Sequence, residues 1–370
     1  MKIKLKQAFD LQMGKTPARN QAENWGGNHR WVSIADIGNA EKYIAKTKEC
    51  ITDAGINASG IKVVPQGTVI MSFKLSIGKT AITAQDMYTN EAIIAFIDKK
   101  IFEIDPNYLY HLCCGTDWTA GTNKAVMGLT LNKATLLEKE ISLPDICQQR
   151  KIAAKLDKID AIIADRQQQL TMIEQAVKSR FIELFGNYIN EGGKPLSELA
   201  TITGGLTKNS KRNAFNLKMP YLRVANVFFN RLDLNEILEI GVREDEIGKT
   251  LLQTGDLLFV EGNGSIEQIG RVAIWDGSIS PILHQNHLIK ARFHKKTILP
   301  EFALFYFMSQ EGRQQIISKS VSTSGLNTLS VNKISSLILP MPPIELQKQF
   351  AAFVAQTDKS KLWGEMEVAA

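Results

Sequence analysis

The chain contains 370 residues, of which 44% are hydrophobic and 22% charged, and its 44 basic and 38 acidic side chains give a net charge of +6. This composition excludes a largely disordered chain and allows two to three domains with sizeable cores. The sequence shows neither a signal-peptide core nor a run of about 18 apolar residues, and its four cysteines have no metal or disulfide spacing. We therefore expect a cytoplasmic protein that does not enter a membrane.

The first 144 residues are predicted to form a β-rich unit, because short apolar runs alternate there with Gly, Pro and Asn. Strands are predicted at residues 31–37, 62–64, 68–73, 80–83, 92–97 and 135–143. Pro106 suits a helix start and predicts a helix over residues 106–113. The unit is therefore expected to begin with strands, continue with a helical patch and end in a last strand.

A long helix is predicted over residues 146–185, within a central segment that spans residues 145–187. Apolar residues recur there with a four-three spacing, and neither Pro nor Gly interrupts the pattern before Gly186. This spacing is typical of a coiled-coil seam, and about 40 helical residues would extend roughly 60 Å.

Residues 188–342 repeat the order of the first unit. Strands are predicted at residues 221–227, 256–260, 271–275 and 287–293, and helices at residues 300–308 and 311–319. The remaining segment, residues 343–370, begins a second amphipathic helix whose apolar pattern fades after Thr357. We expect about 16 helical residues in this segment, so the second helix would be shorter than the first.

One motif occurs twice, and each copy has an apolar run, a proline and an amphipathic helix. Pro342 lies 198 residues after Pro144, and the same offset pairs Gln149 with Gln347. Solenoid repeats are only about 20 to 50 residues long, so this longer repeat indicates two similar domains.

Basic residues lie in stretches without acids in both halves. Residues 54–85 contain three Lys, residues 199–232 contain six Lys or Arg, and neither stretch contains Asp or Glu. Such stretches suit a polyanion such as DNA, although a solvated loop face would give the same pattern.

Motifs for catalysis are incomplete. The Gly-Lys-Thr sequences at residues 78–80 and 248–250 lack the glycine that a phosphate-binding loop needs five positions earlier. His284 and His287 have no accompanying cysteines or well-spaced carboxylates, which disfavours a metal site. We therefore expect a protein that recognises a target and catalyses no reaction.

The duplicated motif resembles that of the specificity (S) subunits of type I restriction-modification systems. The resemblance rests on LPDICQQRKIAAKLDKID at residues 143–160 and on LPMPPIELQ at residues 339–347. It implies an α+β fold with two similar mixed α/β target-recognition domains, each followed by a long helix. The two helices are expected to pack as an antiparallel coiled-coil spacer.

The resemblance also implies a division of tasks. Each domain would read one half of a bipartite double-stranded DNA target, while the helices would set the gap and dock two modification subunits. Restriction subunits would join the full complex. S-adenosylmethionine is expected in the modification subunits, ATP and Mg²⁺ are expected in the restriction subunits, and no cofactor or metal is expected in this chain.

Residues that could contact DNA are basic or amide side chains in the divergent loops, because such groups bind phosphates and base edges. The candidates are Lys15, Arg19, Asn28, Arg30, Lys74, Lys79, Asn123, Lys124, Lys208, Lys211, Arg212, Arg223, Asn263, Arg271, Asn286, His287, Ser324 and Asn327. Candidates for partner binding lie on the central helix: Gln149, Arg150, Ile152, Leu156, Ile159, Ile163, Leu170, Ile173 and Val177.

The short second helix departs from the family pattern and would leave part of the coiled-coil seam unpaired. We expect a second copy of the chain, a modification subunit or nothing at all to cover it. Two other functions remain open: a stand-alone DNA methyltransferase or nuclease with its own recognition domains, and a dimerising scaffold that binds protein. Cofactor binding would favour the first, and salt-dependent binding to duplex DNA would argue against the second.

Overall fold

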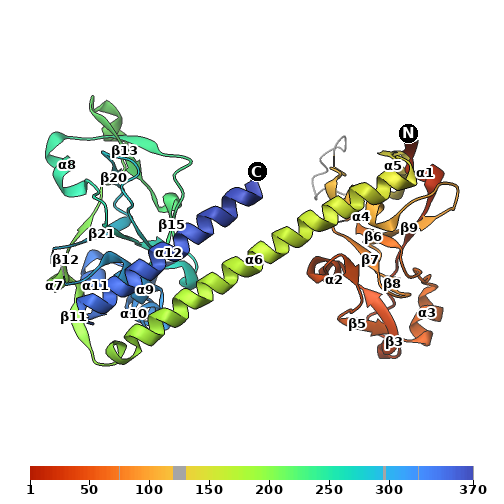
Figure 1. The fold of residues 1–370 in the computed structure, drawn as a ribbon, viewed down its shortest axis with the longest axis horizontal. Helices are drawn as coiled ribbons and strands as arrows, with labels where there is room; N and C mark the ends of the chain where they lie inside the picture. Colours follow the sequence, from red (N-terminus) through yellow and green to blue (C-terminus); the bar gives the residue numbers. More distant parts are fainter. Residues whose placement is uncertain (75, 120–130, 295–296, 324, 370) are drawn as a thin grey trace. The chain divides into compact units, whose positions relative to one another are not determined.

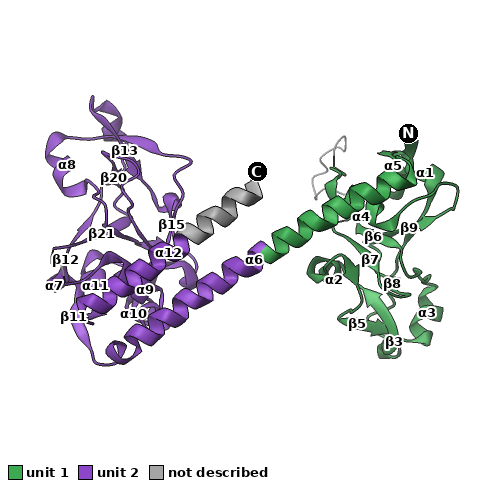
Figure 2. Cartoon of the chain, in the orientation of Figure 1, with its two compact units in different colours: residues 1–165 green, residues 166–370 purple. Residues whose placement is uncertain are grey.

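The computed structural model describes residues 1–74, 76–119, 131–294, 297–323 and 325–369 (Figure 1). The chain forms two compact units, unit 1 (Met1–Asp165) and unit 2 (Arg166–Ala370), as Figure 2 shows. The division falls within the long helix α6 (Ile146–Ile189), so each unit consists of a β-rich body and part of this helix.

Unit 1 is built on a five-stranded sheet with the order β2-β9-β6-β7-β4. A second sheet has the order β5-β3-β8, and β1 pairs with β10 to join the two ends of the unit. The strands are β1 (Lys2–Lys4), β2 (Phe9–Met13), β3 (Trp25–Val32), β4 (Tyr43–Ile44), β5 (Glu49–Ile51), β6 (Val69–Ser72), β7 (Thr80–Thr83), β8 (Tyr88–Thr89), β9 (Ile93–Asp98) and β10 (Glu140–Ser142). Every residue of β6 and β7 is buried, which explains why neither sequence alternates apolar with charged residues.

The helices of unit 1 are short, apart from α6. They are α1 (Leu5–Ala8), η1 (Ala22–Asn24), α2 (Ile34–Asn39), α3 (Asp53–Ser59), α4 (Pro106–Gly115) and α5 (Lys133–Glu138). The predicted helix start at Pro106 is confirmed. The strand predicted at residues 31–37 is wrong beyond Val32, because Ser33 caps α2 through a capping box with Asp36. Likewise, Asn132 caps α5, so residues 133–138 are helical and only the end of the predicted strand 135–143 is extended.

Unit 2 repeats this plan around a four-stranded sheet with the order β12-β21-β17-β19. Smaller sheets have the orders β16-β13-β20 and β18-β23-β22, and the pairs β14-β15 and β11-β24 stand alone. The strands are β11 (Gly193–Pro195), β12 (Ala200–Gly204), β13 (Lys218–Leu222), β14 (Val227–Phe228), β15 (Arg231–Leu232), β16 (Leu238–Gly241), β17 (Leu257–Val260), β18 (Gly262–Asn263), β19 (Val272–Ile274), β20 (Leu283–His284), β21 (Leu288–Phe293), β22 (Val321–Thr323), β23 (Leu326–Thr328) and β24 (Ile338–Pro340). The helices are α7 (Leu196–Leu199), η2 (Ser210–Ala214), η3 (Val224–Asn226), α8 (Glu244–Thr250), η4 (Ile266–Gln268), α9 (Pro300–Met308), α10 (Gln310–Lys319), α11 (Val331–Ser335) and α12 (Ile344–Ala369).

The strand registers confirm that the two units are copies of one fold. In unit 1, β3 pairs in parallel with β8 through Trp31 and Tyr88. In unit 2, β13 pairs in parallel with β20 through Tyr221 and Leu283. The four strands β2-β9-β6-β7 of the larger sheet in unit 1 also match β12-β21-β17-β19 in unit 2, so the duplication seen in the sequence is a duplication of topology.

Helix α12 packs against the second half of α6 inside unit 2, and Figure 1 shows the two segments running in opposite directions. The ring of Phe350 lies 5.3 Å from that of Phe181 and 5.5 Å from that of Phe185, and all three side chains are buried. This contact is the predicted antiparallel helix pair. Two predicted ends were wrong: α6 continues through Gly186 to Ile189, and α12 continues beyond Thr357 to Ala369. With 26 residues against 44, α12 is still the shorter helix.

Candidate nucleic-acid interface

In unit 1, two predicted DNA contacts lie in the turn between β6 and β7. The backbone of Lys79 pairs with that of Ser72, and its side chain is exposed. Lys74 lies in the same turn with its Nζ 5.3 Å from the ring centroid of Phe73. The candidates Asn123 and Lys124 lie outside the described residues.

A second group in unit 1 surrounds Arg19. Its guanidinium lies 3.9 Å from the ring centroid of Trp25 and 5.0 Å from that of Trp31. It also forms a two-point ion pair with Glu49, with N–O distances of 2.5 and 3.0 Å. The hydrogen bond to Glu49 raises the pKa of Arg19 and lowers that of Glu49, so this cation already has an anionic partner.

The remaining candidates of unit 1 lie close to this group in the fold. Asn28 is exposed on β3, and Arg30 on the same strand donates to the Cys50 sulfur at 3.7 Å. The Lys15 ammonium donates to the Ser59 carbonyl at 3.0 Å, at the wall of a cavity of about 560 Å³. The cavity is lined by Lys15, Thr16, Ala18, Gln21, Asn24, Ala58, Ser59 and Glu91.

In unit 2, three candidates that are distant in sequence meet in one place. Asn263 on β18 pairs with Asn327 on β23, and the Asn327 amide donates to the Asn263 carbonyl at 3.3 Å. His287 contacts Glu261 at 2.7 Å through its Nδ1, and its backbone carbonyl accepts a bond from the Glu261 N–H. Asn327 is buried, so its amide holds two loops together, whereas His287 is exposed. Ser324 lies outside the described residues.

Lys208, Lys211 and Asn286 lie on neighbouring segments of unit 2. Leu206 bridges to Gln285, and the Asn286 N–H donates to the Leu206 carbonyl at 3.0 Å. Lys208 and Lys211 follow this bridge and are exposed. These cations are free to contact a polyanion, which keeps them as candidates.

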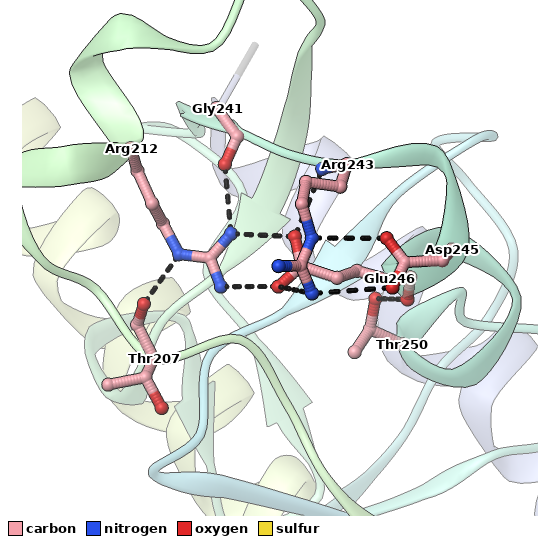
Figure 3. A network of polar contacts seen from close by, with 7 residues as sticks. All are labelled: Thr207, Arg212, Gly241, Arg243, Asp245, Glu246 and Thr250. Carbon is pink, nitrogen blue, oxygen red and sulfur yellow. Dashed lines mark hydrogen bonds and ion pairs between the residues drawn. The ribbon is translucent and has the colours of Figure 1, made fainter.

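Arg212 has a structural role, and its prediction as a DNA contact is not supported. The side chain is buried and forms a two-point ion pair with Glu246 at 2.9 and 3.0 Å. It also donates to the carbonyl oxygens of Thr207 and Gly241 (Figure 3). The hydrogen bond from Arg212 lowers the pKa of Glu246 to about 2. The sequence showed a basic residue in an acid-free stretch, but its partner Glu246 lies 34 residues further along the chain.

A cluster of arginines and one aromatic ring lies beside η3. Arg271 and Arg231 both lie over the ring of Phe228, with guanidinium-to-centroid distances of 5.0 and 4.5 Å. Arg271 donates to the Val224 carbonyl at 3.3 Å. Arg223 is engaged by Glu236 at 2.7 Å. Arg231 was missed as a candidate, although it belongs to the acid-free stretch 199–232.

Two of the predicted partner-binding residues on α6 are buried in their own unit and are therefore not accessible to a partner. Gln149 is buried, and both the oxygen and the nitrogen of its side-chain amide form hydrogen bonds. Val177 lies in the core that contains Phe350. By contrast, Ile152, Ile159 and Ile163 are 40%, 51% and 37% exposed. Arg150 is also exposed, and the half-buried remainder are Leu156, Leu170 and Ile173.

Two kinds of site are absent from the part of the chain that the structure describes. Its helices include none with both the length and the apolar character needed to cross a bilayer. Its His, Cys, Asp and Glu side chains form no group of three or more that could hold a metal ion, and the pair His284 and His287 gains no further ligand.

Comparison with known proteins identifies a family. The family described as "Type I restriction modification DNA specificity domain" matches residues 1–175 and 193–363. The specificity subunit of the type I restriction enzyme EcoKI from Escherichia coli is 30% identical over 58% of this chain and half of its own length. The MjaIX specificity subunit from Methanocaldococcus jannaschii is 24% identical over 95% of this chain and 85% of its own length.

Solved structures show the same fold. The S subunit of a type I restriction-modification system from M. genitalium has a TM-score of 0.55 and 15% identity, and the match covers 100% of this chain and 92% of that one. A chain from a study of assembly and conformational transition of the type I system has a TM-score of 0.57 and 16% identity over 100% and 93%.

Proposed function

The chain belongs to the type I restriction-modification DNA specificity family, and from this premise we propose that it is the sequence-reading subunit of such a complex. Each unit would read one half of a bipartite double-stranded DNA target. The chain itself would catalyse neither methylation nor cleavage. A cytoplasmic setting, which the free cysteines suit, would give it access to the genome.

The observation that carries this proposal is the repetition of one scaffold with different loops. The turn from β6 to β7 in unit 1 is short, whereas its counterpart in unit 2 includes β18 and pairs with β23. A constant scaffold with divergent loops is the arrangement expected where two copies of a fold recognise different targets. The exposed cations Lys79, Lys208 and Lys211 supply the positive charge that DNA binding needs.

The exposed part of α6 supports a docking role. Ile152, Ile159 and Ile163 recur at spacings of seven and four residues, so they lie on one stripe of the helix. Apolar side chains in such a stripe are stabilised when a partner removes them from water. We infer that this stripe binds the modification subunits. Two such subunits would join the complex, and they would carry S-adenosylmethionine. Restriction subunits that use ATP and Mg²⁺ would complete the complex.

The test is to express the chain with its modification partner and to map N6-methyladenine across the host genome. We expect methylation at a split motif, with two defined half-sequences separated by a fixed unread gap. Replacing unit 2 by that of a relative should change one half-sequence and leave the other intact. A genome without a split methylated motif, in cells where both proteins are present and associated, would contradict the proposal.

A further inference from the structure

Lys79 in unit 1 and Arg271 in unit 2 occupy the same position of the repeated fold. In unit 1 the Ser72 N–H donates to the Lys79 carbonyl at 2.8 Å, and in unit 2 the Val260 N–H donates to the Arg271 carbonyl at 2.9 Å. Strand β7 begins directly after Lys79, and β19 begins directly after Arg271. The two residues are therefore equivalent by backbone pairing.

The same turn geometry positions both cations. The residue before each is a glycine, Gly78 with φ +91° and Gly270 with φ +62°, a backbone region that favours glycine. Each glycine donates its N–H back across the hairpin, to the carbonyl oxygen of Ser72 and Val260 respectively. The adjoining loops differ between the units, but both units keep this turn of a glycine followed by a basic residue.

Both cations also project toward the short helical segment that follows the central strand of the smaller sheet. Arg271 reaches the Val224 carbonyl of η3. In unit 1 the corresponding segment is α2, where a Cβ on Gly38 would lie 2.6 Å from the Lys79 Nζ. The absence of a side chain at Gly38 thus leaves room for the ammonium group.

Neither cation has an acidic partner among the residues that the structure describes. The side chains of Lys79 and Arg271 take part in no ion pair there, and the Nε of Arg271 is buried without a hydrogen-bond acceptor. Burial alone lowers the pKa of Arg271, since no neighbouring carboxylate opposes it. Arg271 as a whole is half-buried, and an anion bound at its accessible part would offset the cost of burying the positive charge.

In unit 2 a second cation strengthens the site. Arg231 and Arg271 share the ring of Phe228, and Arg231 is exposed and likewise forms no ion pair among the described residues. The two positive charges repel each other, and an anion bound between them would offset this repulsion. The ring of Phe228 thus contacts both guanidinium groups.

We propose that Lys79 and the pair Arg231–Arg271 are equivalent anchors for DNA phosphodiester groups, one in each unit, which hold the double helix without reading its sequence. The proposal rests on the proposed function, because it names the backbone contacts of the same DNA. The proposal assigns phosphate binding to the turn that both units share and base reading to the divergent loops.

The test measures binding of the full-length chain to two duplexes of equal length and unrelated sequence over a series of salt concentrations. Lys79→Gln and Arg271→Gln should each reduce the magnitude of the negative slope of log K against log salt by about one, and the double variant by about two. The loss of affinity should be the same for both duplexes. Lys79→Arg and Arg271→Lys keep the charge and should keep the slope.

Lys2→Gln and Lys194→Gln are the matched controls, since each removes an exposed cation from the same unit. They should leave the slope unchanged. If Lys79→Gln and Arg271→Gln keep the salt dependence of the wild type, these residues are not phosphate anchors, although the chain still binds DNA. A loss of affinity for only one of the two duplexes would also contradict the anchors. A wild-type chain that binds neither duplex would overturn the proposed function as well.

Discussion

The side-chain amide of Gln149 makes the same three hydrogen bonds in unit 1 that the amide of Gln347 makes in unit 2. The Oε1 of Gln149 accepts from the Asp105 N–H at 2.9 Å, and its Nε2 donates to the carbonyl oxygens of Glu103 and Pro144 at 2.9 Å. The Oε1 of Gln347 accepts from the Leu299 N–H at 2.8 Å, and its Nε2 donates to Thr297 at 3.0 Å and Pro342 at 2.9 Å. Each glutamine therefore joins the start of a long helix to the segment that begins α4 or α9.

These amides are predicted to stabilise their units. Gln149→Leu or Gln347→Leu would leave one N–H and two carbonyl groups without a side-chain partner, and each unsatisfied buried group costs about 1–3 kcal/mol. We expect a loss of roughly 3 kcal/mol in the free energy of unfolding, confined to the unit that carries the change. Urea denaturation followed by hydrogen exchange would resolve the two units.

The neighbouring glutamines provide the control for this prediction. Gln148 and Gln349 are exposed, so Gln148→Leu and Gln349→Leu should change the free energy of unfolding by less than about 0.5 kcal/mol. Equal effects at buried and exposed positions would show that the hydrogen bonds do not hold the helix in place.

The ion pair of Arg212 and Glu246 is predicted to support unit 2 and to make no contribution to DNA affinity. Glu246→Gln leaves the buried guanidinium without a counter-charge, which typically costs roughly 3–5 kcal/mol. The pKa of Glu246 is depressed from 4.5 to about 2 in the fold, so its stabilising effect is complete above pH 4.5 and is lost as the pH falls toward 2.

Urea denaturation of wild type and Glu246→Gln at several pH values checks this prediction. The difference in unfolding free energy should be largest near neutral pH and should shrink as the solution is acidified. The salt slope of DNA binding should match that of the wild type at neutral pH. A salt dependence steeper than that of the wild type in the folded variant, where Arg212 has lost its counter-charge, would restore Arg212 as a DNA contact.

His284 is predicted to make unit 2 sensitive to acid. Burial is the main cause that lowers its pKa from 6.5 to about 4, and its Nε2 has no hydrogen-bond partner among the described residues. The unfolded chain therefore binds a proton in a range where the folded chain does not, and stability should fall as the pH drops from 6.5 to 4. The slope reaches at most about 1.4 kcal/mol per pH unit.

Unit 1 suggests the variant that tests this prediction. Thr89 pairs with Val32 in unit 1 as His284 pairs with Leu222 in unit 2. The variant His284→Thr therefore gives unit 2 the residue that unit 1 has at the equivalent position. The variant should lose the pH dependence between 6.5 and 4, whatever its absolute stability. If the slope of unfolding free energy against pH persists in that range, another group causes it.

The exposed stripe on α6 is predicted to bind the modification subunit. Ile159→Ser combined with Ile163→Ser should weaken this association by at least about tenfold, because a buried isoleucine contributes roughly 1.5–3 kcal/mol. Ile182→Ser is the control, since this residue is 65% exposed on the same helix and lies outside the predicted seam. Titration calorimetry with purified modification subunit gives the affinities, and equal loss in all variants would contradict a specific stripe.

The sequence predicted the repeated plan well because buried strands and proline-started helices leave local signals. Residues 80–83 and 300–308 have the predicted bounds. It misjudged segments where a cap decides the structure, such as Ser33 with Asp36. The charged residues were harder, because an ion pair such as that of Arg212 and Glu246 depends on contacts between distant segments. Conversely, the equivalence of Lys79 and Arg271 is visible in the sequence, since Ile-Gly-Lys at residues 77–79 matches Ile-Gly-Arg at residues 269–271, but their lack of acidic partners among the described residues is not.

The strand pair that joins the ends of unit 1 also dictates when this unit can fold. The Met1 ammonium donates to the Leu143 carbonyl, 142 residues away, and β1 finds its partner only in β10. Contacts of such long sequence separation form late, because a large loop must first be closed. On the ribosome, the β1–β10 pair therefore cannot form until β10 has been translated. Since unit 2 begins after that strand, synthesis completes the first domain before the second can compete for its strands.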